Sequence, residues 1–193
     1  MSGAVRAVCW RPIWNEAHSG VGLEHCLVAP GSADSMLLAV DEDGSPFRLA
    51  YHLDWHADWR LSRAALTVTT AAGSRSLALA TDGDGRWHDG DGRRLGTLDG
   101  CLDIDIWPTP LTNSLPIRRE PFAVGERRVF RMAWVSAPTL AVRPMQQAYT
   151  RLAERRWRYE SLDGSGFTAE LAVDGDGLVL DYPGVFARAV PPA

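Results

Sequence analysis

Hydrophobic and polar residues alternate along most of this chain, and Asp-Gly turns interrupt the alternation at short intervals. Leu66, Val68 and Thr70 fall on one face of an extended segment, and residues 167–173 repeat the pattern. A period of two is typical of a half-buried strand. Aspartate and glycine tolerate the positive φ of tight hairpins, and such turn signals stand at 43–44, 82–85, 89–92, 163–164 and 174–177. The pattern therefore predicts antiparallel β-structure with many hairpins.

The stretch from 139 to 152 has two interpretations. A helix would place four residues with i, i+3, i+4 and i+7 spacing on one face: Met145, Ala148, Tyr149 and Leu152. Pro144 fits the first position of that helix. An extended strand beginning at Thr139 would instead group Gln147 and Arg151 with Tyr149 on one face. Both interpretations remain open at this stage, with the helix retained as the working prediction.

No segment is typical of a linker between domains. The glycine-rich stretch 82–96 has the composition of two consecutive hairpin turns. We therefore expect a single β-barrel-like domain over residues 1–193. Its fold class is all-β, with one antiparallel sheet curled into a large barrel or half-barrel and at most one or two short helices.

Residues 99–120, DGCLDIDIWPTPLTNSLPIRRE, contain a dense cluster of polar side chains. Asp103 and Asp105 alternate with isoleucines, so a strand would put both carboxylates on one face. Three prolines follow and predict a loop, because proline disfavours both a helix interior and a central strand. The loop and its end carry hydroxyl, amide and guanidinium groups: Thr109, Thr112, Asn113, Arg118 and Arg119. The block is either a structural polar network or a polar binding site.

The same block resembles the signature of a bacterial glycolipid-binding family. Further matching words cover nearly the whole chain: GVGLEHC at 20–26, the pair Trp59-Arg60, DGRW at 84–87, VRPMQQAY at 142–149, RYES at 158–161 and VDGDGLVLDYPGVFAR at 173–188. Leu111 departs from the family pattern, in which we expect phenylalanine. The resemblance implies a fold similar to that of lipid-carrying β half-barrels.

The resemblance also implies non-catalytic binding of a glycolipid or another amphipathic lipid. An apolar interior would hold the acyl chain, at roughly 0.8 kcal/mol per buried methylene, and a polar rim would hold the head group. The rim candidates are Asp103, Asp105, Thr109, Thr112, Asn113, Arg118 and Arg119. Either arginine can hold a phosphate or carboxylate in bidentate fashion. Further candidates come from the other matching words: Glu24, Trp59, Arg86 and Gln147.

Two other functions fit these residues. Asp103 and Asp105 would lie about 7 Å apart along a strand and can act as acid and base in an enzyme on a small polar or sugar-containing substrate. That function predicts a raised pKa for one carboxyl in a pocket. In the other alternative, the aspartates and arginines form a buried salt-bridge network that only locks the fold. This structural-lock alternative predicts that every charged side chain of the motif is buried and paired.

Composition narrows the partners. The formal net charge is −4 and the pI is near 5.7, which argues against nonspecific nucleic-acid binding. No apolar run is long enough to span a membrane, and the first residues lack the pattern of a signal peptide, so we expect a cytoplasmic protein. Exposed edge strands often pair, which makes a homodimer a further expectation.

No metal, cofactor or catalytic nucleophile is expected. Cys9, Cys26 and Cys101 lack CxxC spacing, so we expect small, reduced and buried side chains there. His52 and His56 would lie far apart on a strand. The Asp-Gly runs lack the distal glutamate of a calcium loop, and no serine or cysteine stands in a diagnostic nucleophile motif.

Overall fold

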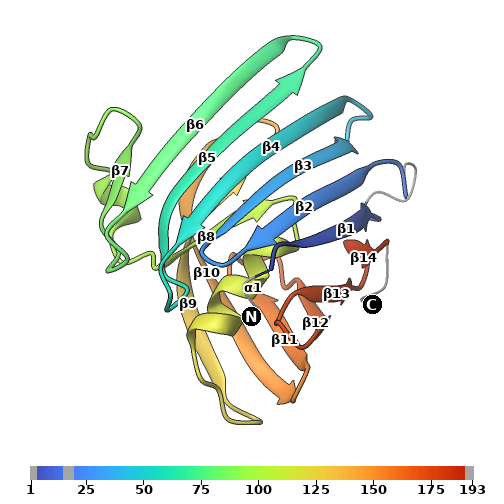
Figure 1. Ribbon diagram of the computed structural model, residues 1–193, viewed down its shortest axis with the longest axis vertical. Coiled ribbons are helices and arrows are strands. Elements are labelled where there is room, and N and C mark those ends of the chain that lie inside the picture. The colour runs from blue at the N-terminus through green and yellow to red at the C-terminus, as the bar shows by residue number, and fades with distance from the viewer. Residues whose placement is uncertain (1–3, 15–19, 190–193) are drawn as a thin grey trace.

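A computed structural model describes residues 4–14 and 20–189, whose strands form one curled, open sheet (Figure 1). The strands are β1 (Arg6–Pro12), β2 (Leu23–Ala29), β3 (Ser32–Val40), β4 (Pro46–Trp55), β5 (Leu61–Thr70), β6 (Gly73–Thr81), β7 (Trp87–Asp89), β8 (Asp103–Trp107), β9 (Arg127–Ser136), β10 (Ala141–Ala153), β11 (Arg156–Ser161), β12 (Thr168–Val173), β13 (Val179–Tyr182) and β14 (Phe186–Arg188). The helical elements are the 3-10 turns η2 (Gly96–Leu98) and η3 (Leu111–Asn113) and the helix α1 (Ser114–Arg119). The predicted all-β half-barrel is confirmed.

The strand order joins the two halves of the chain in the middle of the sheet. The order is β7-β6-β5-β4-β3-β2-β1-β14-β13-β12-β11-β10-β9-β8. Neighbours are antiparallel except β8 and β9, which are parallel. The curl of the sheet brings its two ends together next to β7 and β8. There the Gly100 amide donates to the Gly85 carbonyl at 3.0 Å. A Cβ on Gly85 would lie 3.0 Å from the Gly100 Cα, so this approach requires glycine.

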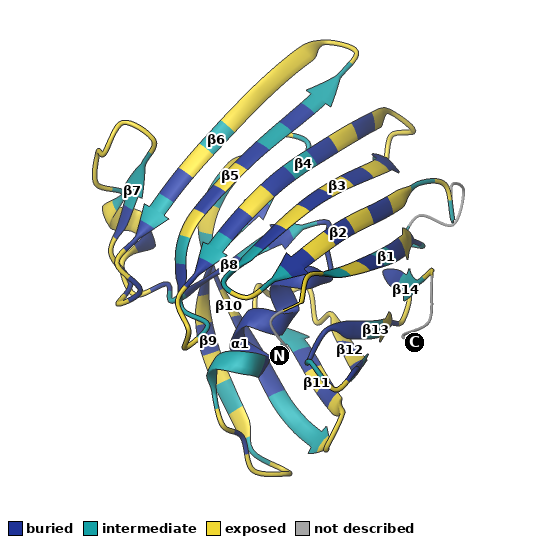
Figure 2. Cartoon of the chain, in the orientation of Figure 1, coloured by how far each residue is buried: buried dark blue, intermediate teal, exposed yellow. Residues whose placement is uncertain are grey.

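The turn signals and the alternation both appear in the structure. Each of the five predicted Asp-Gly turns either connects two strands or, at 89–92, follows β7. Buried and exposed residues alternate along β2, β3, β4 and β5 (Figure 2). Leu66 and Val68 are buried on the same face of β5, as the pattern predicts. β7 and β8 are the two edge strands of the sheet. The expected homodimer through edge strands stays a prediction.

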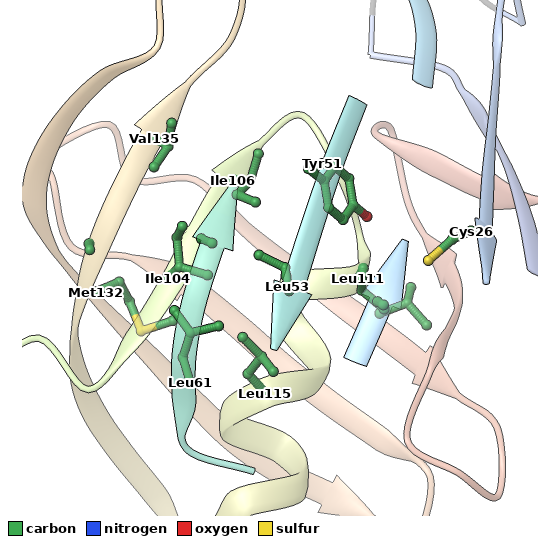
Figure 3. Packing of buried hydrophobic residues seen from close by; sticks show 14 of the residues in the cluster. Cys26, Tyr51, Leu53, Leu61, Ile104, Ile106, Leu111, Leu115, Met132 and Val135 are labelled. Atoms are coloured by element: carbon green, nitrogen blue, oxygen red, sulfur yellow. The ribbon is translucent and has the colours of Figure 1, made fainter. Parts of the chain in front are cut away.

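The concave side of the sheet is filled by side chains and by the segment that contains α1. Leu111 and Leu115 point from this segment toward Leu53, Ile104 and Ile106 (Figure 3), and all five are buried. Full burial of an aliphatic side chain of this size contributes roughly 1.5–3 kcal/mol. The segment is therefore anchored against both the first half of the chain and β8.

The predicted helix over 145–152 is wrong, and the alternative strand is correct. These residues belong to β10, which pairs with β9 along 141–150. The apolar spacing arises because residues on both faces of β10 are buried. Pro144 is tolerated because β11 pairs with β10 only from Gln147 onward, so at Pro144 none of the described strands pairs with that edge of β10.

The predicted loop after β8 is also partly wrong, because it contains η3 and α1. Pro116 is the third residue of α1. The first N–H groups of a helix have no partner within the helix, so a proline at this position removes no helical hydrogen bond.

The thiols of Cys26 and Cys101 are free and buried, as expected, whereas Cys9 is partly exposed. In the described part of the chain, none of the helices combines the length and apolarity that crossing a membrane requires.

Candidate functional site

A cleft of about 450 Å³ lies at the end of the half-barrel where the β3–β4, β9–β10, β11–β12 and β13–β14 turns gather. Its size falls within the usual range of small-molecule sites. Hydroxyl, amide and carboxylate groups line it from Asp105, Thr109, Asn113 and Ser161. Aromatic rings form much of the remaining wall, from Trp107, Trp134, Tyr159, Phe167, Tyr182 and Phe186. We call this hollow the Asp105 cleft.

Asp105 is held in place by side chains from two other elements. Thr112, in η3, donates to Asp105 Oδ1 at 3.1 Å, and the Gln147 amide, from β10, donates to Oδ2. The next η3 residue, Asn113, donates to the Tyr149 hydroxyl at 2.9 Å. Desolvation raises the pKa of Asp105, while the two hydrogen bonds to its carboxylate oppose that shift. Asp105 forms no ion pair with any described residue.

Thr109 connects the cleft to a second buried carboxyl, that of Glu24 on β2. Glu24 Oε1 accepts hydrogen bonds from Tyr51 at 2.6 Å, Thr109 at 2.7 Å and Ser35 at 2.9 Å. Glu24 Oε2 is buried and has no partner among the described residues. Desolvation raises the pKa of Glu24 to about 7, although the three hydroxyl groups lower it.

Asp103 has a different environment from Asp105, although both lie on β8. Arg119 Nη2 contacts Asp103 Oδ2 at 2.7 Å, and both side chains are almost fully buried. Arg119 also pairs with Glu120. Burial raises the pKa of Asp103, and Arg119 opposes this shift. The pair fixes the end of α1 to β8, and neither residue lines the Asp105 cleft.

Three other predicted site residues lie away from the cleft. The Arg118 guanidinium packs over the Trp59 ring, with 5.0 Å between its carbon and the ring centroid. Trp59 in turn stacks on Trp55, with centroids 5.1 Å apart. Arg86 is exposed in the turn between β6 and β7. The structure therefore gathers Asp105, Thr109, Thr112, Asn113 and Gln147, and leaves Arg86, Trp59 and Arg118 outside.

Sequence reasoning missed three neighbouring tyrosines, of which Tyr159 and Tyr182 line the cleft. Tyr149, Tyr159 and Tyr182 form a row across β10, β11 and β13, with ring centroids 5.5 and 6.0 Å apart. Burial raises the pKa of all three hydroxyls, and the charge of Asp105 adds to each shift. The sequence did mark these tyrosines in one respect: each lies in a segment that matches the family, at 142–149, 158–161 and 173–188.

The fold and the cleft define an open β half-barrel with a partly aromatic cleft, and the comparisons assign the chain to a family. A family described as "Putative glycolipid-binding" matches residues 9–188. The crystal structure of a DUF1089 family protein from Pseudomonas aeruginosa is similar, with 50% sequence identity, a TM-score of 0.84, and coverage of 86% of this chain and 90% of that one. No curated protein matches the chain. The chain therefore belongs to the family with that description.

Proposed function

We propose that this protein binds the polar head group of a glycolipid or a related amphipathic lipid in the Asp105 cleft, without catalysis. The observation that carries the proposal is the combination of oriented polar groups and aromatic walls in a single hollow. Aromatic faces pack on the apolar faces of sugar rings, and a few placed polar groups fix the orientation of a ligand. The family description points to the same ligand class.

The polar groups are held in position before a ligand arrives. Thr112 and Gln147 fix the Asp105 carboxylate, which remains partly exposed and can accept further hydrogen bonds from ligand hydroxyls. Asn113 is fixed through its amide nitrogen by Tyr149, while its carbonyl oxygen makes no hydrogen bond with any described residue. Such preorganisation lowers the entropic cost of binding.

The apolar part of the ligand would lie against the aliphatic lining of the cleft. Ile106, Met145 and Val185 contribute to that lining. Each methylene buried there would add roughly 0.8 kcal/mol of affinity. Leu111 and Leu115 fill the deeper interior, so the proposal places the first methylenes in the cleft and not in the centre of the half-barrel.

The structural-lock alternative is favoured for one part of the motif. Asp103 and Arg119 are buried against each other, which is what a lock requires. The enzyme alternative needs Asp103 and Asp105 to reach one substrate, whereas Asp103 is fully buried and lies outside the cleft lining. We therefore assign fold stabilisation to Asp103 and ligand binding to Asp105.

The test is a titration of the purified protein with octyl β-glucoside below its micelle concentration, followed by calorimetry. We expect saturable binding that weakens about tenfold in Asp105→Asn, because a hydrogen bond to a charged group contributes roughly 1.5–3 kcal/mol. Arg86→Gln is the matched control, since Arg86 is exposed outside the cleft. Absence of binding, or equal loss in both variants, would refute the proposal.

A further inference from the structure

The lining of the Asp105 cleft has an unbalanced charge. Among the described residues it includes four carboxylates and no arginine or histidine: Asp41, Glu42, Asp105 and Asp163. The whole chain is much more even, with 20 basic and 24 acidic residues. The Arg143 guanidinium packs over the ring of the lining residue Trp134 at 4.5 Å, but Arg143 does not itself line the cleft. The cleft is therefore acidic in an otherwise mixed chain.

At least one of these acids is ionised over the whole physiological range. The Ser165 backbone amide donates to Asp163 Oδ1 at 2.9 Å, and the hydrogen bonds from Ser165 lower the pKa of Asp163 to about 2. The negative potential of several carboxylates in one concave site attracts cations and repels phosphate and carboxylate groups. Arg118 and Arg119, the predicted anion ligands, lie outside this lining.

Polar groups without partners indicate that the same cleft is built for a ligand. Tyr182 is only 7% exposed and lines the cleft, yet its hydroxyl makes no hydrogen bond with any described residue. Ser161 Oγ, also in the lining, is buried without a partner in the described part of the chain. The rings of Tyr159 and Tyr182 offer faces on which a cation is favourable.

We propose that the Asp105 cleft selects an amine-bearing, cationic head group, such as that of an amino sugar, over heads that carry phosphate or carboxylate. The ammonium would donate charge-assisted hydrogen bonds to the carboxylates, while the sugar ring packs on the tyrosines. This inference rests on the proposed function of the cleft and names the class of its ligand.

The test compares three ligands with the same octyl chain: octyl β-glucoside, its 2-amino-2-deoxy counterpart, and octyl β-glucuronide. Each is titrated into the full chain by calorimetry, at a pH where the amine is protonated. We expect the amine to bind about tenfold more tightly than the neutral sugar, and the glucuronide to bind more weakly than both. The amine's advantage should shrink at high salt, because salt screens exposed charges.

Two variants assign the preference to the cleft. Glu42→Gln removes an exposed carboxylate of the lining and should reduce the ratio of amine to neutral affinity two- to threefold. Asp91→Asn removes an exposed carboxylate from the turn after β7 and should leave the ratio unchanged.

The outcomes separate this inference from the function on which it rests. Equal affinities for the three ligands, tighter binding of the glucuronide, or an equal effect of Asp91→Asn would overturn the charge preference and leave lipid binding intact. Failure of all three ligands to bind would overturn the proposed function, and the charge preference with it.

Discussion

Glu24 is a buried acid with no cationic partner among the described residues, and this makes its protonation part of the folding equilibrium. Its carboxyl is fully buried, and its pKa rises from 4.5 to about 7 in the folded protein. The folded state therefore binds the proton more tightly than the unfolded state does. The resulting stability is fully present below the unfolded pKa and is lost as pH rises through the folded pKa. We expect this group to contribute about 3 kcal/mol of destabilisation between pH 4.5 and pH 8.

The contribution of Glu24 is isolated by comparison with Glu24→Gln, which keeps the shape and an acceptor for Ser35, Tyr51 and Thr109. Chemical denaturation at several pH values should show the variant gaining about 3 kcal/mol relative to the parent as pH rises from 4.5 to 8. Other titrating groups cancel in that difference. A difference that is constant with pH would contradict a raised pKa for Glu24.

Individual site residues could be predicted when they are close in sequence, but their partners could not. Asp105, Thr109, Thr112 and Asn113 stand within nine residues, so one block contained them all. The contact of Thr109 with Glu24 spans 85 positions, and alternation states which face a residue occupies but not what it meets there. For the same reason the sequence offered a buried network of aspartates and arginines as an alternative, but it did not specify that Arg119 pairs with Asp103 and that Asp105 has no ion pair with any described residue.

At the scale of elements, α1 is attached to β8 by the buried pair of Asp103 and Arg119. Removing one partner leaves the other as a buried charge with poorer pairing, and this typically costs 3–5 kcal/mol. We expect Asp103→Asn and Arg119→Gln each to destabilise the fold by about 3 kcal/mol, measured by denaturant unfolding. The double variant should lose clearly less than the sum of the two. Strict additivity would show that the pair does not act as a lock.

The elements that sequence patterns predicted best are strands with one buried and one exposed face. β5 is such a strand, and its alternation gave the correct structure. β10 is covered on both faces near its centre, so Met145, Ala148 and Tyr149 mimicked a helical spacing. The helix α1 was missed because it is only six residues long and contains Pro116. Short elements depend on tertiary packing more than on local propensity.

At the scale of the whole molecule, the two halves of the chain share one sheet and one core. β1 pairs with β14 over only three residue pairs. Asp174 reinforces this junction, since it contacts Arg6 at 3.0 Å and Arg188 at 3.6 Å. The segment after β8 contacts both halves, because Thr109 bonds to Glu24 and Asn113 bonds to Tyr149. These connections support the expectation of a single domain over residues 1–193.

A single domain should unfold in one step even when it is weakened at the junction. Phe186 lies on β14, is 1% exposed, and packs on Trp14 at 5.2 Å between ring centroids. Phe186→Ala should cost about 3–5 kcal/mol, because it leaves a cavity in a closely packed core. Val129→Ala, at an exposed position of β9, should cost less than about 0.5 kcal/mol and is the control. Far-ultraviolet circular dichroism reports the sheet and tryptophan fluorescence reports the core, so both transitions should shift together in Phe186→Ala. Two separated transitions would mean that β1–β7 and β8–β14 fold as independent units.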